Sequence, residues 1–228
     1  MSDARSPTLF DVIGPIMVGP SSSHTAGAVR LGQIGRAILG AQPERVTIEL
    51  HGSFALTGRG HGTDRAVVAG LLGFRTDDER IRDGLELAHA AGMAVDFKAA
   101  DFGPTAHPNA LRITMRAGET ACSLSGASVG GGMVLITAID DYEVNFSATY
   151  HTLLIVAEDR PGTINAVTSW LAAHRINVAF LRVGRRERGG EAIMIIETDE
   201  PVPDAVAAGM ATFPWTRWVR RIFRVNEQ

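Results

Sequence analysis

Residues 152–174 read TLLIVAEDRPGTINAVTSWLAAH, and this stretch decides the fold of the C-terminal part of the chain. The apolar run over 152–157 has the length and composition of a buried strand. Asp159-Arg160-Pro161-Gly162 supplies the residue types of a turn, and apolar side chains then recur over 163–174 at the spacing of one helix face. The stretch therefore predicts a strand, a tight turn and a helix.

The pattern continues to the end of the sequence. Strands are predicted over 177–183 and 191–198, a short helix over 204–210 and a last strand over 218–225. The resulting order, βαββαβ, is that of a ferredoxin-like split-βαβ module. We therefore predict two domains, 1–149 and 150–228, the second of them ferredoxin-like.

The region before residue 150 predicts a mixed α/β domain, so that the fold class of the whole chain is α+β. Helices are expected over 26–39, 65–72 and 77–91, a strand over 45–50 and a glycine-rich turn over 58–62. Extended runs follow at 94–99, 110–116, 120–125, 133–139 and 142–147.

The composition excludes several classes of protein. With 228 residues, 45% hydrophobic and 21% charged, the chain is neither disordered nor collagen-like. Its longest apolar stretches, such as 133–139, are far shorter than the roughly 20 residues of a membrane span. The first ten residues lack the apolar core of a secretory signal, and we expect a cytoplasmic protein.

Charge and cysteine content limit the partners and cofactors. A formal net charge of −3 gives no general attraction for nucleic acid. Because Cys122 is the sole cysteine, this chain cannot build a disulfide or a cysteine-ligated metal cluster alone. The sequence contains neither His-Glu-x-x-His nor Gly-x-Ser-x-Gly, and no Gly-x-Gly-x-x-Gly turn or P-loop. No metal ligand is predicted in this chain.

Gly19-Pro20-Ser21-Ser22-Ser23-His24-Thr25 is the first candidate site. It precedes a predicted helix, where free backbone N–H groups and hydroxyls suit a carboxylate or phosphate. A helix cap with spare polar residues in a solvated loop explains the same pattern.

Gly60-His61-Gly62-Thr63-Asp64 is the second candidate. Glycines on both sides of a histidine permit close approach by a substrate, and an imidazole is the commonest general base. A solvated loop histidine is the alternative. His107-Pro108-Asn109 and the run Gly126-Ala-Ser-Val-Gly-Gly-Gly132 complete the set, and a bulge or turn within a sheet is favoured for the run.

In this order, the four motifs resemble the β chain of the bacterial iron–sulfur-dependent L-serine dehydratases. Residues 150–228 are similar to an ACT domain, a small amino-acid-sensing module, and region 1–149 resembles the allosteric-substrate-binding domain of some phosphoglycerate dehydrogenases. The resemblance implies a lyase that converts L-serine to pyruvate and ammonia.

The resemblance also implies a cofactor and partners. In that family three cysteines hold a [4Fe–4S] cluster, so the cluster would belong to a separate α chain, with the present chain as the β subunit. The ACT-like domain implies self-association and binding of a small amino acid, L-serine. No nucleic acid or membrane partner is expected.

Motifs and resemblance together give the candidate site residues. His24 and His61 are the catalytic candidates, one as base or its orienting partner and the other positioning substrate, with the assignment left open. The substrate-binding candidates are Ser21, Ser22, Ser23, Thr25, Asp64 and Asn109. The effector-binding candidates, at a turn where Gly162 permits close approach to a helix N-terminus, are Asp159, Arg160, Gly162 and Thr163.

A non-catalytic subunit that only senses amino acids is the alternative function. Such a sensor needs hydrogen-bonding groups at His24 and His61 but no proton-transfer group.

Overall fold

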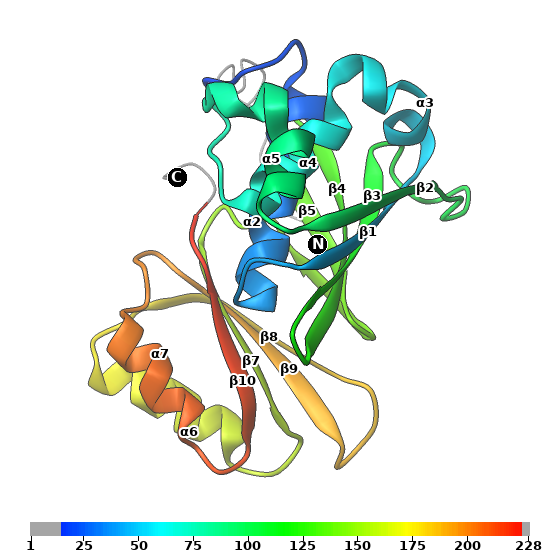
Figure 1. Ribbon diagram of the computed structural model, residues 1–228. Coiled ribbons are helices and arrows are strands. Elements are labelled where there is room, and N and C mark those ends of the chain that lie inside the picture. Colours follow the sequence, from blue (N-terminus) through cyan, green and yellow to red (C-terminus); the bar gives the residue numbers. More distant parts are fainter. Residues whose placement is uncertain (1–14, 225–228) are drawn as a thin grey trace. The chain divides into compact units, whose positions relative to one another are not determined.

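A computed structural model describes residues 15–224 of the chain. The chain divides into two compact units, Met1–Ile136 and Thr137–Gln228 (Figure 1). The domain boundary expected near residue 149 stays a prediction.

The first unit places helices on one face of a mixed sheet. Its helical elements are η1 (Ser22–Ala26), α2 (Gly27–Leu39), α3 (Gly52–His61), α4 (Thr63–Leu72), η2 (Glu79–Asp83) and α5 (Gly84–Ala90). The strands of the sheet are β1 (Arg45–Leu50), β2 (Ala94–Ala99), β3 (Ala110–Ala117), β4 (Thr120–Gly130), β5 (Met133–Ile139) and β6 (Tyr142–Phe146). The boundary between the two units falls within β5, and β6 belongs to the second unit. The strand order is β2-β1-β3-β4-β5-β6, with β1 parallel to β2 and antiparallel to β3.

Side chains alternate across this sheet. In β1, Val46, Ile48 and Leu50 are buried on the helix side, while Arg45 is exposed on the other. Cys122 of β4 is also buried, as its strand position predicts. The sheet therefore has one apolar face under the helices and one polar face.

The C-terminal unit confirms the predicted βαββαβ order. Its elements are β7 (His151–Glu158), α6 (Thr163–Ala173), β8 (Val178–Arg185), β9 (Glu191–Thr198), α7 (Asp204–Ala211) and β10 (Thr216–Ile222). The sheet is antiparallel with strand order β10-β7-β9-β8, and α6 and α7 lie on one face of it (Figure 1). Leu153, Val167, Leu171 and Met210 are among the residues of its core.

The glycine-rich turn predicted over 58–62 is wrong. Residues up to His61 belong to α3, and only Gly62 takes a left-handed conformation, with φ 71°. Tertiary contacts outweigh the low helix propensity of glycine here. Phe54 is fully buried, and the N–H groups of Ser53 and Phe54 both donate to the carbonyl oxygen of Pro108.

Two other helices differ from the prediction in detail. The helix expected over 26–39 is preceded by a π-type turn, η1, which begins at Ser22. The helix expected over 77–91 is split into the 3₁₀ turn η2 and the short helix α5.

Helices α2 and α4 pack closely because glycines face each other between them. A Cβ on Gly32 would overlap the carbonyl oxygen of Val67, and a Cβ on Gly70 would overlap that of Val29. Farther along, the Gln33 side chain donates to the carbonyl of Phe74 at 2.9 Å. Before the helices, the Thr25 hydroxyl donates to the His61 carbonyl. From Thr25 and His61 to Gln33 and Phe74 the contacts advance in the same direction, which makes the two helices parallel and places their N-terminal ends together.

We expect Gly32→Ala and Gly70→Ala each to lower the free energy of unfolding by about 1–3 kcal/mol, the usual cost of overpacking. Urea denaturation measures the change. Gly60→Ala is the matched control, because a Cβ there meets no atom within 4 Å. Equal unfolding midpoints for all three variants would contradict the close-packed interface.

Candidate active site

The segment before α2 folds into a polar π-type turn. Ser21 is extended, with φ −139°, and its hydroxyl accepts a hydrogen bond from the N–H of His24 at 3.2 Å. The N–H of Thr25 donates to the carbonyl of Ser21 at 2.8 Å. Such π-type turns recur at functional sites, and this one fixes the position of the His24 backbone.

Hydroxyl groups hold the His24 ring on both edges. Its Nδ1 lies 3.4 Å from the Ser21 hydroxyl. Its Nε2 lies 3.1 Å from the hydroxyls of both Ser53 and Thr57. The ring also packs edge-on against Phe54, with centroids 5.2 Å apart. The orientation of the imidazole is thus fixed from α3.

His61, at the end of α3, lies against His24. The ring centroids are 4.9 Å apart, and the Thr25 hydroxyl donates to the His61 carbonyl at 3.4 Å. His61 Nδ1 lies 3.2 Å from the Thr57 carbonyl. A carbonyl only accepts, so Nδ1 carries the hydrogen in this bond and the lone pair of neutral His61 is on Nε2. The structure therefore brings the two predicted motifs together.

The pKa of His24 is lowered. Burial is the main cause, repulsion from His61 adds to it, and the hydrogen bond involving Ser53 opposes it. Since a lower pKa favours the neutral form, His24 stays uncharged near neutral pH. A neutral imidazole can accept a proton or hold a neighbouring base in place.

A pocket of about 280 Å³ opens beside His61. Its lining residues are Val18, Gly19, Pro20, Thr25, Gly60, His61, Gly62, Arg65, Ile81 and Arg82. Arg82 pairs with Glu79 at 3.0 Å, whereas Arg65 forms no ion pair within residues 15–224. Arg65 therefore offers a positive charge to an anionic group in this pocket.

Within residues 15–224, the remaining predicted substrate-binding residues form no hydrogen bond with His24 or His61. Ser22 and Ser23 are half-buried in η1. The Asp64 carboxylate caps its own neighbour, accepting from the N–H of Arg65 at 2.9 Å. The Asn109 side chain donates to the Ser128 carbonyl at 3.4 Å. The loop at 107–109 meets the site through Pro108, which anchors the start of α3.

Sequence reasoning missed Ser53, Thr57 and Arg65. Ser53, Thr57 and His61 are spaced four residues apart, which places them on one face of a helix. This spacing could have indicated that the three side chains lie together, but only if residues 52–61 are recognised as a helix.

Comparison with known proteins decides the family. The family model of the serine dehydratase beta chain matches residues 8–138, and the ACT domain model matches residues 151–208. The chain belongs to the serine dehydratase beta chain family. This result confirms the resemblance seen in the motifs.

Relatives of the family align along nearly the whole chain. A probable L-serine dehydratase beta chain of Bacillus subtilis is 42% identical, over 91% of this chain and 94% of its own length. The L-serine dehydratase beta chain of Peptoniphilus asaccharolyticus is 37% identical, over 92% and 96%. A D-3-phosphoglycerate dehydrogenase of Synechocystis is 28% identical over 89% of this chain, but the match covers only 37% of that protein.

In the ACT-like part of this family member, the predicted effector residues surround the start of α6. Gly162 precedes the helix with φ 91°, and the Thr163 hydroxyl donates to the Arg160 carbonyl at 3.1 Å. The Asp159 carboxylate accepts from Arg185 at 2.9 Å and from the N–H of Gly189 at 3.0 Å. These two bonds lower the pKa of Asp159. Its carboxylate thus fastens the β8–β9 turn, and the first backbone N–H groups of α6 are the groups suited to an anion.

Among residues 15–224, no group of three or more His, Cys, Asp or Glu side chains is placed to hold a metal ion. No helix in the described part of the chain is both long and apolar enough to cross a membrane.

We expect His61→Asn to raise the pKa of His24, because the substitution removes a neighbouring positive charge. The pKa should remain below its usual value, since burial is the larger cause. An NMR titration of the His24 ring nitrogens measures both pKa values. His89→Asn, an exposed change in α5, is the control and should leave the His24 titration unmoved. A fall in the His24 pKa in the His61→Asn variant would contradict the interpretation.

Proposed function

We propose that this chain is the β subunit of an L-serine dehydratase, a lyase that forms pyruvate and ammonia from L-serine together with a separate α chain. The single observation that carries the proposal is the packing of His24 against His61, 4.9 Å between ring centroids, beside a pocket with an arginine. The identity to beta chains of L-serine dehydratases supports the same function. Its cytoplasmic location stays a prediction.

His61 is proposed as the base and His24 as its orienting partner. Nδ1 of His61 is engaged with the Thr57 carbonyl, which leaves Nε2 with a lone pair to accept the Cα proton of the substrate. Both nitrogens of His24 already lie within bonding distance of hydroxyl groups. A ring held in this way keeps its orientation and positions the neighbouring His61 ring.

The substrate carboxylate is proposed to bind between η1 and Arg65. Thr25 and Arg65 line the same pocket. The parallel N-terminal ends of α2 and α4 add positive potential there. Ser21, Ser22 and Ser23 complete the polar wall as proposed donors, and Asp64 and Asn109 remain proposed substrate contacts.

The chain does not fit a [4Fe–4S] cluster with three cysteine ligands. Cys122 is its sole cysteine, and it is buried in β4. We therefore propose that the cluster is held by the α chain, and that this chain contributes the histidine pair and the carboxylate site.

The ACT-like domain is proposed to bind a small amino acid such as L-serine and to join two copies of the chain. β8 is an edge strand of its sheet and exposes Phe180, Leu181 and Val183. Pairing of two such edges would cover these side chains and the unpaired backbone groups. The ligand's carboxylate would meet the first N–H groups of α6.

A non-catalytic sensor is less well supported. A sensor needs neither two imidazole rings in contact nor a lowered pKa of His24. Reconstitution of the purified chain with its α chain under anaerobic conditions separates the two functions. Neither chain alone should form pyruvate from L-serine, and the mixture should.

We expect His61→Ala to lower pyruvate formation by the reconstituted enzyme about 10²–10⁴-fold, the usual loss on removing a general base. Assembly of the variant with the α chain, measured by gel filtration, should be unchanged. His89→Ala, an exposed histidine of α5, is the control. Full turnover in the assembled His61→Ala enzyme would favour the sensor.

We expect Ile164→Glu to weaken L-serine binding to the ACT-like domain at least about tenfold by repelling the carboxylate at the start of α6. Ile164 is 43% exposed, so the change buries no charge. Ile164→Gln is the neutral control of equal size. Calorimetry on the full chain measures the affinity, and equal binding by both variants would place the effector elsewhere.

A further inference from the structure

A second pocket lies on the polar face of the first sheet, opposite the helices. Its volume is about 420 Å³, within the range of small-molecule sites. The lining residues are Arg45, Val46, Thr47, Ala94, Val95, Asp96, Thr114, Met115, Arg116 and Ala121. All of them come from β1, β2, β3 and β4, so the pocket belongs to the first unit alone.

The strand register places two arginines side by side in this pocket. Arg45 of β1 is directly opposite Arg116 of β3. On the strands that flank this pair, Ala94 of β2 is the neighbour of Arg45, and Ala121 of β4 is the neighbour of Arg116. The next row toward the middle of the sheet joins Thr47 to Thr114. Two guanidinium groups are thus flanked by methyl groups and hydroxyls, and the small alanines leave the space that forms the hollow.

The carboxylates of this face are already paired with other cations. Asp96, which also lines the pocket, pairs with Lys98 at 3.3 Å. Glu49 pairs with Arg112 at 3.6 Å. Within residues 15–224, neither Arg45 nor Arg116 forms an ion pair. The carboxylates of Glu44 and Glu119, at the ends of the strands, are no exception. Two positive charges are therefore unmatched at one point of the sheet.

Like charges directly opposite each other on neighbouring strands destabilise a sheet. An anion between them removes the repulsion, and arginine is the residue best shaped to bind phosphate or carboxylate oxygens in pairs. The hydroxyls of Thr47 and Thr114 can donate further hydrogen bonds. The arrangement is that of an oxyanion site.

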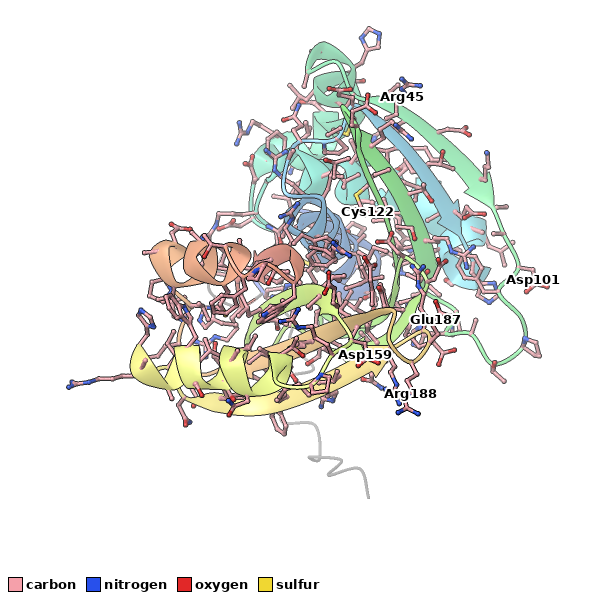
Figure 2. The ribbon with its side chains drawn as sticks, turned by 90° about the horizontal axis from the view of Figure 1, so that it is seen from below. Arg45, Asp101, Cys122, Asp159, Glu187 and Arg188 are labelled. Carbon is pink, nitrogen blue, oxygen red and sulfur yellow. The ribbon has the colours of Figure 1, made fainter. Side chains whose placement is uncertain are left out.

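We propose that this pocket binds a small oxyanion with at least two negative charges, a phosphate or a di- or tricarboxylate, through Arg45, Arg116, Thr47 and Thr114. Figure 2 shows Arg45 where β1 begins. The site is separate from the histidine pair, because it lies on the opposite face of the sheet from α2 and α4. It does not depend on the proposed lyase activity.

The test is calorimetry and thermal unfolding of the full chain with inorganic phosphate and, separately, citrate, at constant ionic strength set with chloride. Both probes should bind more tightly than chloride, and the tighter of the two identifies the ligand class. The melting temperature should rise with the logarithm of the probe concentration. L-serine, which carries no net charge, should not compete.

Arg116→Gln should weaken binding at least about fivefold, and the double variant Arg45→Gln with Arg116→Gln should abolish it. Arg112→Gln is the matched control on the same strand and face, and it should bind the probe with an affinity within about twofold of the natural chain.

Without probe, Arg116→Gln should melt at the same or a higher temperature than the natural chain, because it relieves repulsion between the two arginines, whereas Arg112→Gln loses the partner of Glu49. Binding that survives in the double variant, or no response to either probe beyond that to chloride, would overturn the proposal.

Discussion

The close approach of α2 and α4 is the constraint on which the candidate active site depends. Gly32 and Gly70 allow each helix to touch the backbone of the other, at Val67 and Val29. Side chains between the helices would separate them by several ångströms. His24 and His61 lie just before the two helices, so the glycine contact sets the distance between the imidazoles. The pair thus depends on residues that carry no chemistry themselves.

An element of this fold can be predicted from the sequence when its own residues specify it, and not when contacts with distant residues stabilise it. The ACT-like order is readable because each strand and helix is specified by its own apolar period and by turns such as Asp159–Gly162. Helix α3 is not readable, because three glycines in ten residues oppose it. It is held from outside, by Pro108 and by the burial of Phe54. The two histidines and Ser21 are predicted from their motifs, whereas Ser53 and Thr57, the other hydroxyl partners of His24, are not, because they lie on this helix.

The orientation and the protonation of the His24 ring have a common cause in this site. The contacts that hold the His24 ring also bury it, and burial lowers its pKa. The facing His61 ring lies 4.9 Å from it between centroids and adds to the lowering of the His24 pKa. Close packing therefore both orients His24 beside the proposed base and favours the neutral form of His24.

The two faces of the first sheet can carry separate sites because strand side chains alternate in direction. On β3, Met115 points toward α2 and lies 3.1 Å from where a Cβ on Gly35 would be, while Thr114 and Arg116 point to the opposite face. A ligand between Arg45 and Arg116 is thus one residue away in sequence from the helix interface. Coupling between the sites would require β3 to have two arrangements. Met115 is almost fully buried in a close-packed interior, and its strand is paired on both sides. The arginine pocket is therefore a binding site that we expect to act independently of the histidine pair.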